Sequence, residues 1–235
     1  MNRSPQPRSQ RGFTQVELVF VIVVVVLLAC LAMMFVLQQR TNHETRKRIS
    51  CQSNLKHVGL GFRVFANDNG ERYPFSTTNS LGFTNTTWAW EHFQAMSNEM
   101  GSAKILMCRA DRERYNNIMS DFGMGPHLTS MSLAGHGNAA LSYFVSLDAH
   151  ESLPNVILVG DRNLVTNSGN LQGKVLASSP AGLSAWDERQ HGRCGNATLA
   201  DGSVQRMTNP MLEKQVANSS AGGPGTNRLL LPLLP

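Results

Sequence analysis

Arg11–Leu37 reads R-G-F-T-Q-V-E-L-V-F-V-I-V-V-V-V-L-L-A-C-L-A-M-M-F-V-L, and this stretch decides the fold of the chain. The 20 residues from Leu18 to Leu37 are all apolar and uncharged. As a helix that rises about 1.5 Å per residue, they would span roughly 30 Å, the thickness of the hydrocarbon core of a bilayer. Residues 13–38 are therefore predicted to form a transmembrane helix.

One carboxylate, Glu17, lies at the edge of this apolar run. An unpaired charge deep in lipid costs about 3 kcal/mol or more, so a charge in such a place is usually functional or paired. The order Gly12, Phe13, Thr14 and then Glu17 before an apolar helix resembles the type IV prepilin signal. The resemblance implies that a prepilin peptidase removes residues 1–12 as a leader and methylates the new amino group of Phe13.

The resemblance also implies that subunits assemble through this helix. In assembled pilins the glutamate at the position of Glu17 is thought to face the amino terminus of a neighbouring subunit. The physics agrees, because a carboxylate in a low dielectric needs an opposite charge, and the Phe13 ammonium appears only after cleavage. The alternative is that Glu17 lies at the level of the lipid headgroups and reaches toward water.

Two simpler interpretations of the segment are an ordinary secretory signal and a simple membrane anchor. A secretory signal has an apolar core of about 7–15 residues followed by a small-residue cleavage site. Here the run is longer, and Gln38–Asn42 offers no such site. An anchor explains the length and the apolarity but not the Gly-Phe-Thr-x-x-Glu junction.

The chain has 235 residues, which leaves room for one soluble domain over residues 39–218. Its net charge is +5. Its basic residues are scattered apart from Arg46–Arg48, which we interpret as a solvated helix face, so nucleic acid is not an expected partner. Charge does not decide the orientation in the membrane, because both flanks are basic. The prepilin resemblance implies an inner-membrane protein with a cytoplasmic N-terminus and a periplasmic or filament-borne C-terminal domain.

The predicted fold is α+β and pilin-like, with the long N-terminal helix packed on an antiparallel sheet. An apolar stripe at Leu55, Val58, Phe62 and Phe65 continues the helix beyond the membrane. Glycines 59 and 61 favour a bend or close packing within it. The helix should stop at Asn67–Gly70, a C-cap glycine preceded by turn residues.

Further elements are predicted from apolar runs and turn signals. Asp201-Gly202 is a strong hairpin signal between two short strands. Residues 76–87 are predicted to form a loop, and residues 219–235 a flexible tail. The expected strands are Lys104–Cys108, Leu141–Leu147, Val156–Val159, Ala197–Leu199 and Ser203–Met207, with a short helix at Glu91–Glu99.

Three of the four cysteines lie outside the membrane segment: Cys51, Cys108 and Cys194. An oxidising compartment would permit one disulfide among them and leave one thiol over. We prefer the pair Cys51–Cys108; the alternative is three free thiols.

A second resemblance covers the soluble part, which is similar to prepilin-type proteins with the H-X9-DG C-terminal motif. Four stretches carry it: C-Q-S-N-L-K-H-V-G-L at Cys51–Leu60, N-D-N-G-E-R-Y-P at Asn67–Pro74, I-L-M-C-R-A-D at Ile105–Asp111, and His191 followed by Asp201-Gly202. The third stretch departs from the pattern, because Arg109 stands where the group more often has proline. The resemblance implies an architecture rather than a reaction.

His191 and Asp201 have three interpretations. The first is structural, because Asp-Gly is suited to a tight turn that His191 would cap. The others are metal ligation and acid–base catalysis. Asp161 and Asp201 are a weaker candidate pair for calcium, and His191 with Cys194 and Cys108 for zinc.

The sequence therefore predicts a structural subunit, not an enzyme: a pilin or type II secretion pseudopilin that binds prepilin peptidase, other subunits and inner-membrane lipid. The first alternative is a membrane-anchored module that binds a surface ligand without forming a filament, using a concave patch at Trp88, Trp90 and His92. The second is a tethered hydrolase that uses His191 and Asp201. No cofactor is expected apart from the calcium considered above.

Overall fold

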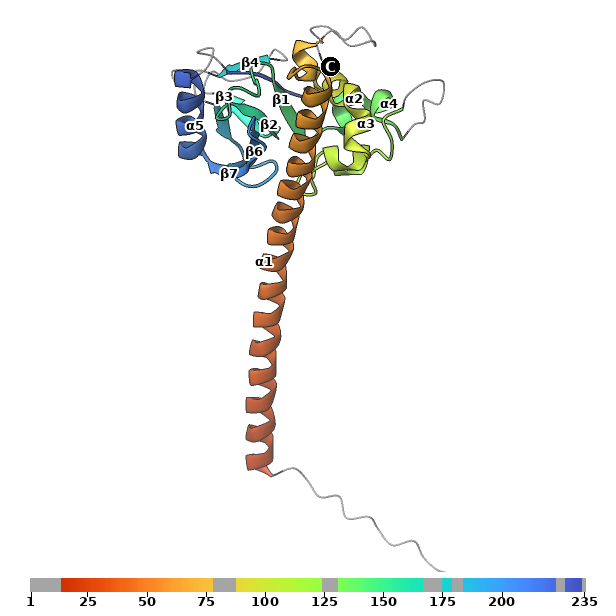
Figure 1. The fold of residues 1–235 in the computed structure, drawn as a ribbon. Helices are drawn as coiled ribbons and strands as arrows, with labels where there is room; N and C mark the ends of the chain where they lie inside the picture. Colours follow the sequence, from red (N-terminus) through yellow and green to blue (C-terminus); the bar gives the residue numbers. More distant parts are fainter. Residues whose placement is uncertain are drawn as a thin grey trace, which may run out of the picture. The chain divides into compact units, whose positions relative to one another are not determined.

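The computed structural model describes residues 14–77, 88–123, 131–166, 175–178, 184–222 and 227–233. The chain forms two compact units, Met1–Thr45 and Arg46–Pro235. Helix α1 (Gln15–Asp68) contributes its first part to one unit and its second part to the other. The fold class is α+β, because the long N-terminal helix is followed by an antiparallel sheet (Figure 1).

The second part of α1 enters the core of the larger unit through one apolar face. Leu55, Val58 and Phe62 are fully buried, and Phe65 is 5% exposed. Spacings of three and four residues put these side chains on the same side of the helix. The predicted apolar stripe is therefore confirmed.

The two glycines inside this part of α1 mark close packing. A Cβ on Gly59 would lie 2.6 Å from Cγ2 of Thr198, and one on Gly61 would lie 3.2 Å from Cγ of Met100. Real Cβ atoms do not approach as closely as the first of these distances, so Gly59 lets the helix backbone approach the sheet. Of the two predicted alternatives, the structure has close packing here.

The helix ends where the turn residues predict. Asp68 is its last residue, and Gly70 follows with φ +66°. The backbone N–H groups of Asn69 and Glu71 both donate to the carbonyl of Ala66. These two bonds satisfy the carbonyl of Ala66, which lies in the last turn of the helix, where carbonyls lack the regular intrahelical partner.

Within the described residues, six strands form one antiparallel sheet in the order β4-β8-β1-β2-β6-β7. A second, two-stranded sheet pairs β3 with β5. The bounds are β1 Tyr143–Ser146, β2 Ile157–Asp161, β3 Leu164–Thr166, β4 Val175–Ser178, β5 Ser184–Trp186, β6 Cys194–Leu199, β7 Val204–Thr208 and β8 Asn227–Leu230.

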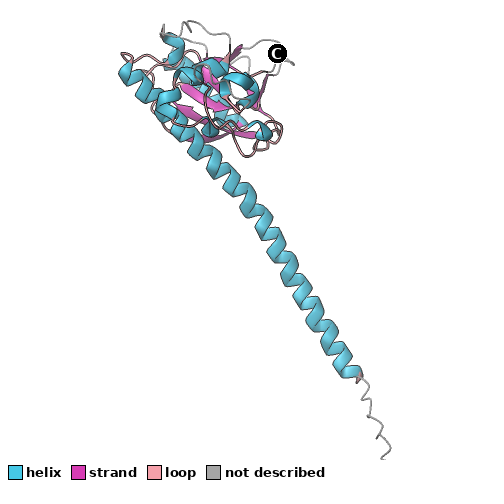
Figure 2. Cartoon of the chain, turned by 90° about the vertical axis from the view of Figure 1, so that its right-hand side faces the viewer, coloured by secondary structure: helices cyan, strands magenta, loops and turns pink. Residues whose placement is uncertain are grey.

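The central strands are buried on both faces, and their alternating side chains divide into two cores. Tyr143 and Val145 of β1 pack in one cluster with the stripe of α1, whereas Phe144 packs in the other with Leu212 and Val216 of α5 (Asn209–Gly222). The period of two along a strand produces this division. Figures 1 and 2 show the sheet with the second part of α1 along it, and Figure 1 shows α5 on the side away from α1.

Short helical segments connect α1 to the sheet. They are η1 Pro74–Ser76, α2 Ala89–Ala95, α3 Ser97–Met100, η2 Ala103–Leu106, η3 Tyr115–Asn117, α4 Leu133–His136 and η4 Gly137–Ala140. Helices α2 and α3 lie where the short helix Glu91–Glu99 is predicted. Of the loop predicted over residues 76–87, residues 78–87 lie outside the described part of the chain.

One predicted strand is wrong. Lys104–Cys108 is not extended, because its first residues belong to η2, where the Ser102 hydroxyl accepts a hydrogen bond from the N–H of Lys104. A short apolar run has the same appearance in a strand and in a buried helical turn, so its pattern does not separate them. The predicted strands at Leu141–Leu147 and Val156–Val159 and the hairpin across Asp201-Gly202 are confirmed as β1, β2 and β6–β7.

The flexible tail predicted over residues 219–235 is also wrong for the part that the structure describes. Ser219 is 2% exposed and lies in α5, and β8 forms an interior strand of the sheet. The buried guanidinium of Arg114 donates to the carbonyl of Pro232 over 2.7 Å. The free energy gained by burying Leu229–Leu231 outweighs the flexibility that the low-complexity sequence before this segment led us to expect.

Candidate functional site

The predicted processing residues Gly12 and Phe13 lie outside the described residues. Glu17, the predicted assembly residue, lies in the first turn of α1 and bonds to Thr14. Its Oε2 accepts hydrogen bonds of 2.9 Å from both the backbone N–H and the hydroxyl of Thr14, and its own N–H donates to that hydroxyl over 3.3 Å. This is a capping box, which the pattern Ser/Thr-x-x-Glu before an apolar run indicates and which our sequence analysis missed.

The apolar run itself has exposed side chains throughout Val16–Leu37, with large residues such as Val16 at 78% and Phe20 at 69% exposure. In the described part of the chain, α1 is the helix long and apolar enough to cross a membrane, judged by length and composition. Water does not favour so much exposed apolar surface on a single helix, so this run is suited to a lipid or protein environment.

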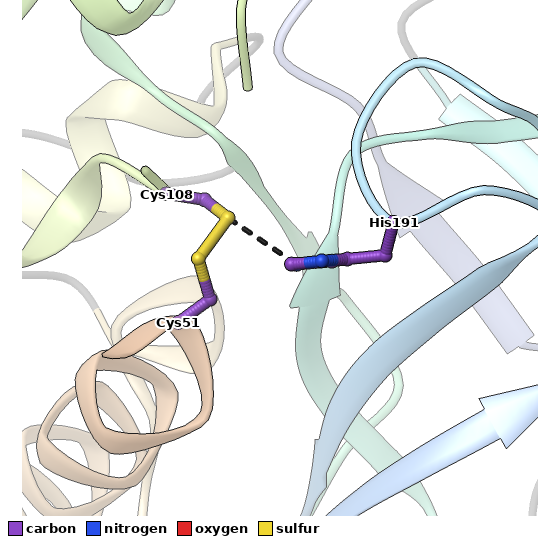
Figure 3. A group of neighbouring side chains, drawn as sticks. All are labelled: Cys51, Cys108 and His191. Atoms are coloured by element: carbon purple, nitrogen blue, oxygen red, sulfur yellow. Dashed lines mark hydrogen bonds between the residues drawn. A yellow bond between two sulfur atoms is a disulfide. The ribbon is translucent and has the colours of Figure 1, made fainter. Parts of the chain in front are cut away.

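A disulfide joins Cys51 of α1 to Cys108, which follows η2, with the two Cα atoms 5.1 Å apart. This is the pair preferred from the sequence. His191 lies beside it, with Nε2 3.3 Å from Sγ of Cys108 (Figure 3). All three residues are buried, and His191 is 5% exposed. The carbonyl of His191 accepts a bond from the Arg48 guanidinium, which links it again to α1.

Asp161 at the end of β2 approaches the same histidine. Its Oδ2 lies 3.5 Å from Nε2 of His191 and accepts hydrogen bonds from the backbone N–H and the side-chain amide of Asn196, at 2.7 and 2.9 Å. Burial raises the pKa of the Asp161 carboxyl to about 7, and the negative charge of Asp111 adds to this rise, although the Asn196 bonds oppose it. A fraction of Asp161 is therefore protonated near neutral pH.

A buried ion pair lies next to this group. Arg162 donates from Nε and Nη2 to the two carboxylate oxygens of Asp111 at 2.7 and 2.8 Å, and Ser142 and Gln190 also donate to Asp111. Burial acts to raise the pKa of Asp111, but the hydrogen bonds and charge of Arg162, with the other two donors, lower it overall. The sequence did not lead us to predict this network. The signal that could have indicated it is Asp111, a carboxylate within the third motif stretch, Ile105–Asp111.

Two pairs of sequence neighbours, Asp161–Arg162 and Gln190–His191, connect the buried ion pair to the surroundings of the disulfide. Asp161 faces His191 while its neighbour Arg162 binds Asp111, and Gln190 binds Asp111 while its neighbour His191 faces the disulfide. A change at any one of these positions therefore affects both the ion pair and the disulfide environment.

The four motif stretches contact one another. Asn54 of the first donates to the carbonyl of Met107 in the third over 3.1 Å. Tyr73 of the second donates through its hydroxyl to the carbonyl of Ala200, next to the Asp-Gly turn of the fourth, over 3.3 Å. His191 of the fourth meets the disulfide between the first and the third. In the structure the four stretches thus contact one another, which gives each of them a role in holding the fold together.

His191 and Asp201, however, do not lie together. Strand β6 (Cys194–Leu199) runs between them, and its six residues at about 3.3 Å each correspond to roughly 20 Å. The side chain of Asp201 instead accepts a bond from the N–H of Ser203 within the turn, and Gly202 has φ +84°. This placement excludes the acid–base pair considered from the sequence. The Asp-Gly turn is confirmed, but the prediction that His191 caps it is wrong, because its ring lies against Cys108 and Asp161.

The predicted calcium pair fails for the same reason. Asp161 lies at one end of β2, where Gly160 pairs with Ala197, whereas the N–H of Asp201 bonds to the carbonyl of Pro154 before the other end. One cation cannot contact both carboxylates. The zinc set is corrected as well: in the described residues, the close group of metal-ligand atoms is Cys51, Cys108 and His191, without Cys194.

The predicted aromatic patch is real only in part. Trp88 and Trp90 line an open pocket of about 430 Å³ together with residues of α4 and η4, among them His136 and Asn138. His92 does not line it; this residue is 1% exposed and packs edge-on against Phe75. Burial lowers the pKa of His92 to about 4, so its imidazole is neutral.

No family model, curated protein or solved structure matches this chain. Its functional assignment therefore follows from the placement and chemistry of its own residues.

Proposed function

We propose that the chain is a pilin-like structural subunit, anchored in the inner membrane by the first part of α1 and assembled through it into a type IV pilus or a type II secretion pseudopilus. The observation that supports this most is the composition of α1. A continuous helix, Gln15–Asp68, carries an exposed, uncharged apolar run in its first part and an amphipathic core stripe in its second.

Glu17 is the residue that gives such a helix its register. Apolar helices in lipid gain little from burying one another, so association depends on packing and on a few polar contacts. A carboxylate at the N-terminal edge of the run would be paired by the amino group of a neighbouring subunit once residues 1–12 are removed. The capping box holds the Glu17 carboxylate at the N-terminal end of α1, where the amino group of a neighbouring subunit would have to reach it.

A structural role is further supported by what the buried polar residues do. Asp111 and Arg162 bind each other, and the Asp-Gly motif forms a turn remote from His191. These residues hold elements together rather than facing an open cavity. The proposal therefore includes no reaction, and its partners are prepilin peptidase, further subunits and membrane lipid.

The decisive experiment is mass spectrometry of the N-terminus of the chain purified from its own membranes. A peptide that begins at N-methylated Phe13 is the expected result. A matched variant, Gly12→Val, puts a branched side chain at the cleavage junction and should retain the leader, whereas Ser9→Val, a similar change within the leader, should be processed normally. An intact leader in the unaltered chain would overturn the proposal.

A second candidate function is supported by the pocket at Trp88 and Trp90. Partly buried indoles that line a pocket beside polar groups suit the apolar faces of sugars, so the rival is an anchored module that binds a saccharide without assembling. Oligosaccharide titration of the detergent-solubilised chain, followed by tryptophan fluorescence, tests it. Saturable quenching that is lost in Trp90→Leu but retained in Trp186→Phe, a buried control, would support this rival.

A further inference from the structure

Basic residues from three separate segments come together at one end of the unit Arg46–Pro235. The first segment is Arg46, Lys47 and Arg48, at the start of the part of α1 that belongs to this unit. Arg46 is exposed, and the other two are half-buried. Like charges repel one another, so a concentration of them favours an anion as its partner.

The disulfide brings the second segment to this end of the helix. The Cα atom of Cys108 lies 5.1 Å from that of Cys51, which follows Arg48 by about one helical turn. Consecutive Cα atoms are about 3.8 Å apart, so the Cα of Arg109 lies within about 9 Å of that of Cys51. Arg109 is exposed, and neither it nor Arg46 forms an ion pair with any residue that the structure describes.

Arg48 itself brings in the third segment. Its Nη2 donates to the carbonyl of His191 over 3.3 Å, and Arg193 follows two residues later. The side chain of Arg193 is 78% exposed and pairs with the similarly exposed Glu188 over 3.0 Å. Exposed pairs of this kind are weak, so Arg193 still contributes positive charge, although Glu188 offsets part of it. We call Arg46, Lys47, Arg48, Arg109 and Arg193 the basic patch.

The place of the basic patch in the sequence indicates what the anion is. Arg46 follows Leu37, the last residue of the apolar run, by nine residues, which corresponds to roughly 14 Å of helix. Helical side chains lean toward the N-terminus, so the long side chain of Arg46 leans toward the apolar run. Lipid headgroups extend roughly 5–7 Å beyond the hydrocarbon core, and their potential reaches about 8 Å further at physiological ionic strength.

We propose that the basic patch binds the headgroups of anionic phospholipids, such as phosphatidylglycerol, in the leaflet that α1 leaves at Leu37. Guanidinium groups suit this partner because their planar donors match phosphate oxygens. The binding requires that the first part of α1 lies in a membrane, so it rests on the proposed function, but it does not require a filament. The disulfide has a part in it, because it keeps Arg109 beside the helix.

The test measures lipid preference with the full-length chain in a mild detergent. Phosphatidylglycerol and phosphatidylcholine with identical acyl chains are added in equal amounts, and native mass spectrometry counts the complexes of each lipid. Complexes with phosphatidylglycerol should exceed the others by about five-fold or more, the factor that a basic residue near an anionic surface contributes. Equal amounts of the two complexes would overturn the proposal.

Variants locate the binding. Arg46→Gln and Arg109→Gln should each reduce the preference by about two- to five-fold, whereas Arg46→Lys keeps the charge and should keep the preference. Arg72→Gln is the matched control, because Arg72 is also exposed but lies beyond Asp68, the other end of α1. An equal loss of preference in Arg72→Gln would show that only the net charge matters and would overturn the assignment to the basic patch.

A second measurement separates this inference from the membrane anchor itself. Reconstituted into vesicles of phosphatidylcholine alone, the chain should resist extraction by alkaline carbonate, as a spanning helix does. A chain that resists extraction but shows no preference for phosphatidylglycerol would overturn the lipid binding and leave the anchor intact. A chain that is extracted would overturn both. Binding of polyglutamate to the inserted chain without a lipid preference, lost in Arg46→Gln, would assign the basic patch to an acidic protein instead.

Discussion

Gly59 of α1 lies directly against Thr198 of β6. A Cβ on Gly59 would stand 2.6 Å from Cγ2 of Thr198, and the Thr198 hydroxyl donates to the carbonyl of Leu55 over 3.3 Å. The threonine thus packs its methyl group on the glycine and bonds to the helix backbone one turn earlier. This contact sets how closely the helix lies on the sheet.

We expect Gly59→Ala to lower the free energy of unfolding by about 1–3 kcal/mol, the usual cost of forcing a methyl group into a packed core. Alanine's better helix propensity, up to about 1 kcal/mol, offsets only part of this loss. Thr198→Ser removes Cγ2 but keeps the hydroxyl, so the double variant should recover most of the stability. Denaturant unfolding of the detergent-solubilised chain measures each value, and strictly additive effects would contradict the steric explanation.

Gly61→Ala is the matched control for this prediction. Its Cβ would meet Cγ of Met100 at 3.2 Å, but methionine is flexible and can move away. The gain in helix propensity then roughly balances the crowding, so stability should change by less than about 1 kcal/mol.

The buried ion pair gives a second prediction. Arg162→Met leaves Asp111 buried, charged and without its main partner, and loss of one member of a buried pair costs about 3–5 kcal/mol. The side chain of Glu113, the outer partner of the same guanidinium, is 54% exposed. Glu113→Gln should therefore cost at most about 1 kcal/mol. Thermal unfolding of the two variants separates them; equal losses would show that the burial of Asp111 does not govern the effect.

Asp161 predicts a pH dependence of stability. Its pKa is about 7 in the folded chain and about 3.9 when unfolded. The folded state therefore binds more protons between these values, so this residue's stabilising contribution is complete below about pH 4 and is lost as the pH rises through 7. Relative to Asp161→Asn, the unaltered chain should lose up to a few kcal/mol over this range.

The measurement is the difference in free energy of unfolding between the two chains at several pH values. His92 has the opposite slope, because its folded pKa of about 4 lies below that of a free histidine, but it is common to both chains and cancels. The titratable groups that interact with Asp161, namely His191, Asp111 and Tyr143, also remain in both chains. A difference that does not change with pH would contradict the raised pKa of Asp161.

Substitutions in the capping box of Thr14 and Glu17 can separate two roles of Glu17, namely helix capping and pairing with a positive charge. Glu17→Gln keeps a side chain that can complete the box but removes the charge. Thr14→Val removes the capping hydroxyl, at a cost of about 1 kcal/mol to the helix terminus, but keeps the charge. If Glu17 pairs with a neighbouring amino group, Glu17→Gln should lose sheared filaments and Thr14→Val should retain them; the reverse result would assign the requirement to capping.

Much of the fold could be predicted from the sequence because the signals were local. The apolar stripe at Leu55–Phe65, the stop at Gly70 and the Asp201-Gly202 hairpin each depend on a few neighbouring residues. Strand β8 could not be predicted in this way. Its residues, Asn227–Leu230, follow a Gly-rich segment, and only pairing with distant β1 and β4 makes them a strand.

The candidate site divides along the same line. The sequence pointed to the Cys51–Cys108 pair and, in the candidate zinc set, to His191 with Cys108, but it wrongly added Cys194 and did not bring His191 to the disulfide. His191 and Asp201 lie beyond opposite ends of β6, and this separation was missed because the strand was expected to begin at Ala197 and begins at Cys194. The ion pair of Asp111 and Arg162 also depends on long-range packing, so neither residue has a local signature.

The place of β8 in the sheet has a consequence for the order of events during synthesis. Residues 227–230 leave the ribosome after the seven other strands that the structure describes, yet they lie between β4 and β1. Until they arrive, the edge of β1 has unpaired backbone groups, and such an edge readily pairs with a strand of another chain. The newly made polypeptide therefore passes through a period in which it needs protection from its own copies, and that period ends only when β8 closes the gap.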